Sequence, residues 1–142
     1  MGNLAKNQNG LNPELKQLSR MIGTWKATDS EGHEGKTSFE WMEGKHFLIH
    51  HVDLGDTKGI EFIGYDEPSD SVKSFYFDTE GNLRQYTYHV RDNVIKITID
   101  MPEVQGEFNG DLNNDGTKLI GNWDLMENGH RKGSKATLTR IA

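Results

Sequence analysis

The chain of 142 residues contains no cysteine. A protein without cysteine can form no disulfide, no thiolate nucleophile and no zinc site built on cysteine ligands. No apolar run approaches the roughly 18 residues of a membrane-spanning helix. The first ten residues, MGNLAKNQNG, also lack the apolar stretch of a secretion signal. We therefore expect a cytoplasmic protein that does not associate with a membrane.

Basic residues are outnumbered by acidic ones. Lysine and arginine total 16 against 22 aspartate and glutamate residues, which gives a formal net charge of −6 at pH 7. The basic residues are also scattered singly, whereas a phosphate-binding surface needs them clustered. We therefore do not expect a nucleic acid as partner.

Aliphatic and phenylalanine side chains are scarce as well. Leu, Ile, Val and Phe make up about a fifth of the chain, close to the roughly 20% below which disorder is favoured. The length is that of one ordinary domain, and no linker or internal repeat divides it. We expect a single domain over residues 1–142 with a thin or partly hollow core, preceded by a flexible segment at residues 1–10.

One short helix is predicted near the N-terminus. Residues 12–14 (Asn-Pro-Glu) combine an N-cap side chain, a proline at the first helical position and an acid in the first turn. Leu15, Leu18 and Ile22 follow at helical spacing. Gly23 then ends the helix, because glycine adopts the left-handed conformation of a C-terminal cap without penalty.

From Thr24 onward, apolar side chains recur at every second position. The clearest case is VIKITIDM at 94–101, in which three isoleucines and a methionine share one face. Ten such runs are separated mostly by turn-forming residues, and their spacing of about 8–12 residues predicts consecutive antiparallel strands. The runs lie near 24–29, 36–43, 46–53, 59–65, 72–78, 83–90, 94–101, 105–112, 118–126 and 134–141.

Aromatic residues dominate the faces that we expect to point inward. So many large rings fit a barrel with an aromatic interior better than a small, tightly packed sandwich. The predicted fold class is therefore all-β, a ten-stranded up-and-down antiparallel barrel with a short N-terminal helix that covers its mouth or lower end. An ordinary β-sandwich is the alternative.

Two local motifs resemble the calycin superfamily of lipocalin-like and fatty-acid-binding-like barrels. They are GTW, with Gly23 and Trp25, at the start of the first strand, and TLTRIA, with Arg140, on the last. In that superfamily the tryptophan lies across the closed end of the barrel and the arginine packs on its ring. The resemblance implies that Trp25 and Arg140 form a structural plug through a cation–π contact.

A group of short lipocalin-like proteins is similar to this chain in length and in the spacing of its sequence motifs. Its W-x-x-G-K/R-x-F-L segment is matched by residues 41–48, WMEGKHFL, and its I-G-Y-D segment by residues 63–66. The similarity covers most of the chain from about residue 15 onward. It agrees with a barrel cavity for a small apolar or amphipathic molecule.

The predicted cavity wall is aromatic, with two polar handles. His51 shares a strand face with Phe47 and Ile49, the more apolar face, whereas His46 and His50 share the other. A histidine buried in an aromatic pocket can orient a ligand or act as a general base. The ligand-binding residues that we expect are Phe39, Trp41, His51, Phe62, Phe77, Tyr88 and Trp123, with His51 and Tyr88 as the polar groups.

No metal or cofactor is expected. A metal site needs three or four converging ligands, and the histidines near 46–51 are spread along one strand. The nitrobindin branch of calycin-like barrels holds haem through a histidine on its final strand, whereas the final strand here, SKATLTRIA, has none. His130 falls in the preceding turn.

Two other functions stay open at this point. One is an enzyme on the same barrel, either a haem-dependent, nitrobindin-like isomerase or a cofactor-free isomerase or hydrolase that uses a buried histidine. The other is a protein–protein module whose outer barrel face forms a homodimer.

Overall fold

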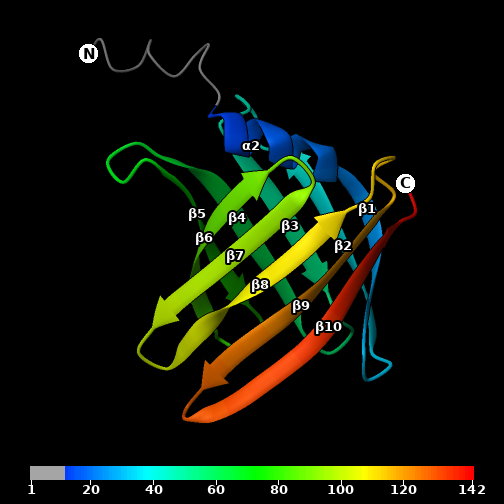
Figure 1. Ribbon diagram of the computed structural model, residues 1–142, viewed down its shortest axis with the longest axis vertical. Helices are drawn as coiled ribbons and strands as arrows, with labels where there is room; N and C mark the ends of the chain where they lie inside the picture. The colour runs from blue at the N-terminus through cyan, green and yellow to red at the C-terminus, as the bar shows by residue number, and fades with distance from the viewer. Residues whose placement is uncertain (1–11) are drawn as a thin grey trace.

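A computed structural model describes residues 12–142, which form one closed antiparallel β-barrel (Figure 1). The segment at residues 1–10 that was expected to be flexible lies outside the described residues. The strands are β1 (Gly23–Asp29), β2 (Glu34–Trp41), β3 (Phe47–Asp53), β4 (Lys58–Asp66), β5 (Ser71–Asp78), β6 (Leu83–Arg91), β7 (Val94–Met101), β8 (Val104–Leu112), β9 (Lys118–Glu127) and β10 (His130–Arg140).

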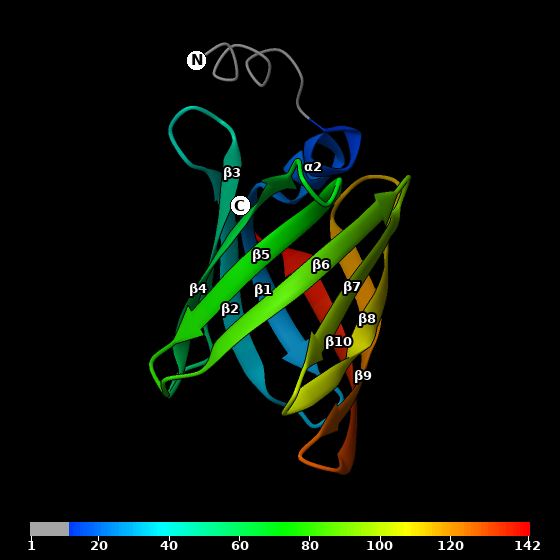
Figure 2. The same cartoon turned by 90° about the vertical axis from the view of Figure 1, so that its left-hand side faces the viewer.

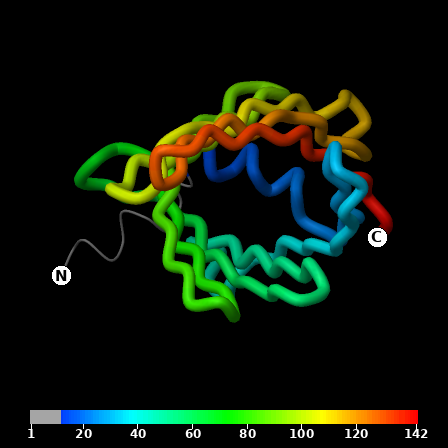
Figure 3. The backbone as a smooth tube through the Cα atoms, turned by 90° about the horizontal axis from the view of Figure 1, so that it is seen from below, coloured from blue at the N-terminus to red at the C-terminus, as the bar shows by residue number. Residues whose placement is uncertain are grey.

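Each strand pairs with its neighbours in the sequence, and β1 also pairs with β10. This last pairing closes the ring, which Figure 3 shows from below. The predicted ten-stranded up-and-down barrel is therefore confirmed. The sandwich alternative is wrong, because two packed sheets would leave edge strands unpaired.

The connection between β9 and β10 is shorter than the sequence suggested. The predicted runs end near 126 and resume near 134, which leaves a turn over 127–133, but the strands run to Glu127 and resume at His130. Only Asn128 and Gly129 lie between them, with φ of 51° and 80°. An Asn-Gly pair with positive φ at both residues is the preferred two-residue hairpin loop. His130 is therefore an exposed strand residue rather than part of a loop.

A short helical segment covers one end of the barrel (Figure 2). It consists of helix α2 (Pro13–Leu18) and the 3₁₀ turn η1 (Ser19–Met21). Leu15, Leu18 and Met21 are at most 2% exposed and belong to the hydrophobic core. Nowhere in residues 12–142 is there a helix with the length and apolar character that crossing a membrane requires. The segment closes the barrel end by burying its apolar side chains there.

The two ends of the helical segment depend on particular residues. The Asn12 side chain accepts hydrogen bonds from the backbone N–H groups of Glu14 and Leu15, as the predicted N-cap should. The prediction that Gly23 is a left-handed cap is wrong, because η1 follows the helix and Gly23 has a φ of 128° inside β1. Glycine is required there because a Cβ would lie 2.5 Å from Nη1 of Arg140 and 2.6 Å from the carbonyl oxygen of Ala142.

The same end of the barrel holds Trp25 and Arg140 side by side. They are cross-strand partners on β1 and β10, and the guanidinium carbon lies 4.2 Å from the centre of the indole ring. Trp25 is fully buried and donates its Nε1–H to the carbonyl of Met21 at 2.8 Å. Arg140 donates to the carbonyls of Arg20 and Ile22 at 2.6 Å. The two side chains thus connect the barrel wall to the helical segment.

Candidate functional site

An apolar cavity of about 190 Å³ lies inside the barrel, next to the helical segment. Its volume is below the roughly 300–1,000 Å³ of sites for drug-sized ligands and close to that of a cavity that admits benzene, about 150 Å³. The apolar lining comes from the helical segment, from seven strands and from the turn after β3: Leu18, Met21, Ala27, Phe39, Val52, Leu54, Ile95, Ile97, Phe108, Leu119, Trp123, Ala136 and Leu138.

The cavity has one polar wall. Three polar side chains line it, Thr37 on β2, His50 on β3 and Tyr88 on β6. Glu61 on β4 bonds to His50 and Tyr88 of this wall, and Ser74 on β5 bonds to Glu61; Glu61 is 3% and Ser74 1% exposed. These five residues are called the polar cluster below. Their strands bring together side chains that are as much as 51 positions apart in the sequence.

Glu61 lies at the centre of the polar cluster and accepts three hydrogen bonds. Its Oε2 accepts from the Ser74 hydroxyl at 2.5 Å and from the Tyr88 hydroxyl at 2.8 Å. Its Oε1 lies 2.7 Å from Nδ1 of His50, which stands opposite Glu61 in the β3–β4 register. A buried carboxylate is tolerated only when donors replace its lost hydration, and these three groups supply them.

His50 is held on both nitrogens and on one ring face. Nδ1 faces Glu61, while Nε2 is in hydrogen-bond contact with Oγ1 of Thr37. The Phe39 ring stacks on the imidazole, with centroids 4.0 Å apart and planes 5° apart. Thr37 Oγ1 also donates to the carbonyl of His51 at 2.8 Å. The imidazole therefore has a defined orientation beside the cavity.

The tyrosines near Glu61 are poor acids in this environment. Burial raises the pKa of the Tyr88 phenol well above its ordinary value, and the charge of Glu61 and its hydrogen bond raise it further. Burial likewise raises the pKa of Tyr86, and it raises the pKa of Tyr76 to about 12. Tyr88 therefore keeps its proton near neutral pH and donates a hydrogen bond to Glu61.

Three of the seven predicted ligand-binding residues line the cavity: Phe39, Tyr88 and Trp123. Trp41 is half-buried and packs against the core at the end of β2, but it does not line the cavity. The other three, His51, Phe62 and Phe77, lie on the outer face of the barrel. Their expected place in the cavity wall is therefore wrong.

These errors arise because the wrong set of alternate residues on β3, β4 and β5 was assigned to the inner face. On β3, the buried Leu48 points inward together with His50, so Phe47, Ile49 and His51 point outward. His51 is exposed and pairs with Glu40 at 2.8 Å. His51 was expected inside because it shares the more apolar face of β3 with Phe47 and Ile49. That face is the outer one, because the outside of the barrel also carries apolar residues here.

Sequence reasoning missed four members of the polar cluster: Thr37, His50, Glu61 and Ser74. Glu61 has a local signal, because it stands alone as a charge in the apolar run GIEFIGY. Its neighbours Ile60 and Phe62 are apolar and so is Ile63, so the run alone does not show which side of the strand is buried. The other three missed residues, Thr37, His50 and Ser74, lie on three different strands, and their spacing in the sequence does not indicate that they meet Glu61.

The opposite end of the barrel is open. A hollow of about 770 Å³ there is lined by polar and apolar residues, including Arg84, Tyr86 and Lys132. Trp123 borders both this hollow and the inner cavity. Its ring lies 5.2 Å from that of Phe108 and 6.1 Å from that of Tyr86, centre to centre. Trp123 therefore stands between the cavity and the open end.

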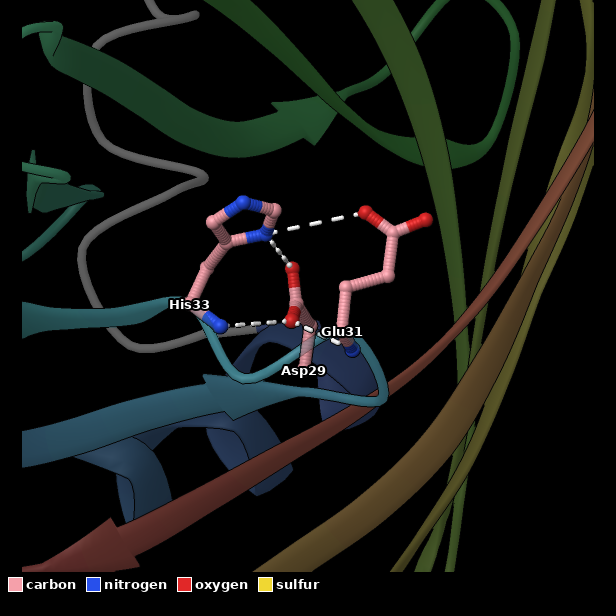
Figure 4. A group of neighbouring side chains, drawn as sticks. All are labelled: Asp29, Glu31 and His33. Carbon is pink, nitrogen blue, oxygen red and sulfur yellow. Dashed lines mark hydrogen bonds and ion pairs between the residues drawn. The ribbon is translucent and has the colours of Figure 1, made fainter.

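One group of residues at the open end has the composition of a metal site. Within residues 12–142, Asp29, Glu31 and His33 have potential ligand atoms within 4.8 Å of one another (Figure 4). Asp29 accepts from the backbone N–H groups of Glu31 and His33 at 2.9 Å, and its other oxygen lies 2.8 Å from Nδ1 of His33. The His33 contact lowers the pKa of Asp29 and raises that of His33. These bonds make the group a turn between β1 and β2.

The chain matches no model of a known protein family, and no curated protein has a significantly similar sequence.

Proposed function

We propose that the protein binds one small, largely apolar molecule inside the barrel. The observation that carries this proposal is the apolar cavity inside the barrel with a single polar wall formed by Thr37, His50 and Tyr88. Sites of this kind hold a ligand by apolar contact and orient it by a few polar groups. The volume suits a single ring with a short substituent, and the polar wall suits a hydroxyl or carbonyl group on it.

The architecture supports a place among calycin-like barrels, many of which carry ligands inside the barrel. The closed barrel, the N-terminal helix and the Trp25–Arg140 contact all agree with the resemblance described above. The haem-dependent alternative has little support. Among residues 12–142, His50 is the one histidine that is not exposed, its two nitrogens are already engaged, and the cavity is far smaller than a haem.

Phenol and toluene are suitable probes, because each is a single ring and they differ by one hydroxyl group. We expect phenol to bind with one molecule per chain and to raise the melting temperature, since only the folded barrel offers the site. Phenol should bind more tightly than toluene, because its hydroxyl can bond to the polar wall. Isothermal titration calorimetry and thermal melts measure both effects.

A matched pair of variants separates the cavity from the surface. Ala136→Leu places a larger side chain into the cavity, whereas Thr137→Leu adds the same side chain on the opposite face of β10. We expect Ala136→Leu to abolish phenol binding and Thr137→Leu to preserve it. Equal binding by the two variants, or no binding by the unmodified protein, would contradict the proposal.

We also propose that two copies associate through the outer face of β3–β6. Four apolar residues on this face are 41–50% exposed: Phe47, Phe75, Phe77 and Leu83. Strand register places Phe75 beside Phe62, and Phe77 between Ile60 and Leu83. A contiguous exposed apolar patch commonly marks an interaction surface, and most other outward positions of the barrel are polar or charged. A second copy offers the same apolar chemistry to this face.

A further inference from the structure

The polar cluster contains an ordered chain of three groups. A carboxylate oxygen of Glu61 lies 2.7 Å from Nδ1 of His50. On the other side of the ring, Nε2 contacts the hydroxyl of Thr37. In such a chain the hydroxyl can act as a nucleophile, the imidazole as its base and the acid as the group that orients the base. Such a constellation is recognised by geometry and not by the order of residues in the chain.

The protons of this chain can be placed consistently. With a neutral imidazole, Nδ1–H donates to Glu61 and Nε2 is free to accept. The single proton of the Thr37 hydroxyl has two acceptors in reach, the carbonyl of His51 at 2.8 Å and Nε2 of His50, and rotation of the hydroxyl moves it from the carbonyl to Nε2. A proton that leaves Thr37 therefore has a base in contact, and the imidazolium that forms faces the carboxylate of Glu61.

Core stability alone does not account for this arrangement. A buried carboxylate carries a desolvation cost that apolar residues of similar volume avoid, and the rest of the cavity wall is apolar. The buried polar groups are gathered at one side of the cavity, and Thr37 and His50 both line it. The Ser74 and Tyr88 hydroxyls further fix the carboxylate that orients the imidazole.

We propose that Thr37, His50 and Glu61 hydrolyse a small ester bound in the cavity; this inference rests on the proposed binding function. Thr37 Oγ1 attacks the ester carbonyl carbon while its proton moves to Nε2 of His50. The ester C–O bond breaks, the alcohol leaves with that proton, and the acyl group stays on Oγ1. Water then attacks the acyl group, giving one proton to His50, so that the carboxylic acid leaves and Oγ1 regains its proton.

Thr37 and His50 are the catalytic residues of this reaction, and Glu61 is a positioning residue that acts through His50. The substrate class follows from the cavity. Its volume of about 190 Å³ and apolar lining suit an aryl ester of a short carboxylic acid, with the ring against the apolar wall and the ester group at Thr37.

Phenyl acetate tests the proposal, with phenol release as the readout. We expect Thr37→Val, which keeps the shape and removes the nucleophile that the base activates, to lower kcat/KM about a hundredfold or more. His50→Gln should lower it similarly. Thr37→Ser keeps a hydroxyl and should retain most activity. Glu61→Asp keeps the carboxylate and should retain more activity than Glu61→Gln.

His51→Gln is the matched control. His51 pairs with Glu40 on the outer face at 2.8 Å, so it has the same kind of partner as His50 but no cavity. Its substitution should leave phenol release unchanged. Loss of release in His51→Gln, or full release in Thr37→Val, would assign the hydrolysis to surface histidines and overturn the proposal.

Intact-protein mass and phenol binding complete the test. An acetyl group should be found on the unmodified protein after mixing with phenyl acetate, located at Thr37 by peptide mapping and missing in Thr37→Val. Phenol binding without ester hydrolysis would overturn this inference and leave the binding function intact. If phenol does not bind either, the proposed binding function fails together with the inference.

Discussion

Single residues carry most of the chemistry in this barrel, and Glu61 is the clearest case. Its carboxylate is 3% exposed and accepts from Ser74, His50 and Tyr88. Each of these donors is itself buried or half-buried, so that each depends on Glu61 for its own hydrogen bond. The loss of one carboxylate would therefore leave several polar groups unsatisfied together.

Glu61→Ala should destabilise the protein strongly. Removal of the carboxylate leaves the donors of Ser74, His50 and Tyr88 without their acceptor, and each buried group left unsatisfied costs about 1–3 kcal/mol. Urea unfolding measures the free energy of unfolding of the variant. The control is Glu40→Ala, which removes the exposed carboxylate paired with His51 and should cost less than about 1 kcal/mol. Similar losses for the two variants would mean that the polar cluster is not energetically coupled.

At the scale of elements, two segments far apart in the sequence close the helix end. The helical segment covers the opening (Figure 2), and β10 brings Arg140 across to β1. The Trp25 indole contacts Arg140 on its face and donates to Met21 of η1. Helix, first strand and last strand therefore depend on one another at this end, although the helical segment has only nine residues.

Trp25→Ala should lower the free energy of unfolding by about 3–5 kcal/mol, the usual cost of truncating a buried aromatic residue. Arg140→Ala should cost less, because its hydrogen bonds go to carbonyls that water can partly reach. Since the two side chains touch, the double variant should lose less than the sum of the single losses. Denaturant melts of the three variants measure this coupling. Strictly additive losses would show that the ring–guanidinium contact contributes nothing.

At the scale of the whole molecule, the barrel has two kinds of apolar surface. One lines the cavity inside, and the other is the outer face of β3–β6 with its half-exposed phenylalanines. Strands β3 to β5 carry large apolar residues on their outer faces, whereas β1, β2 and β10 are polar outside. An asymmetric exterior of this kind is expected when one side of a barrel faces another molecule.

Phe75→Lys should therefore convert a dimer into a monomer. The side chain is 48% exposed, so a lysine can reach solvent in the single chain but would be buried as a charge between two copies. Sedimentation velocity over a range of concentrations measures the mass. Ile120→Lys is the control, because Ile120 is 40% exposed on β9, away from this face, and it should leave the dimer unchanged. A monomeric unmodified protein at its highest soluble concentration would contradict the proposed dimer.

The number of strands, their order and the helix start are properties that the sequence alone determines. Period-two alternation from Thr24 onward and turn residues between the runs are local signals. Short turns between neighbouring runs leave antiparallel pairing as the natural outcome. The Asn12-Pro13 helix start is equally local, since capping involves residues within one turn. These predictions needed no knowledge of contacts between distant residues, and the barrel confirms them.

Which face of each strand points inward was decided only by the tertiary structure. His50 and His51 are adjacent, and closure of the barrel places one beside the cavity and the other in solvent. Alternation defines two faces but does not say which is inside when both carry apolar residues. The polar cluster depends on the register of five strands, a long-range property that no local pattern encodes. For that reason the sequence predicted the barrel, whereas the association of Thr37, His50 and Glu61 emerged only from the closed fold.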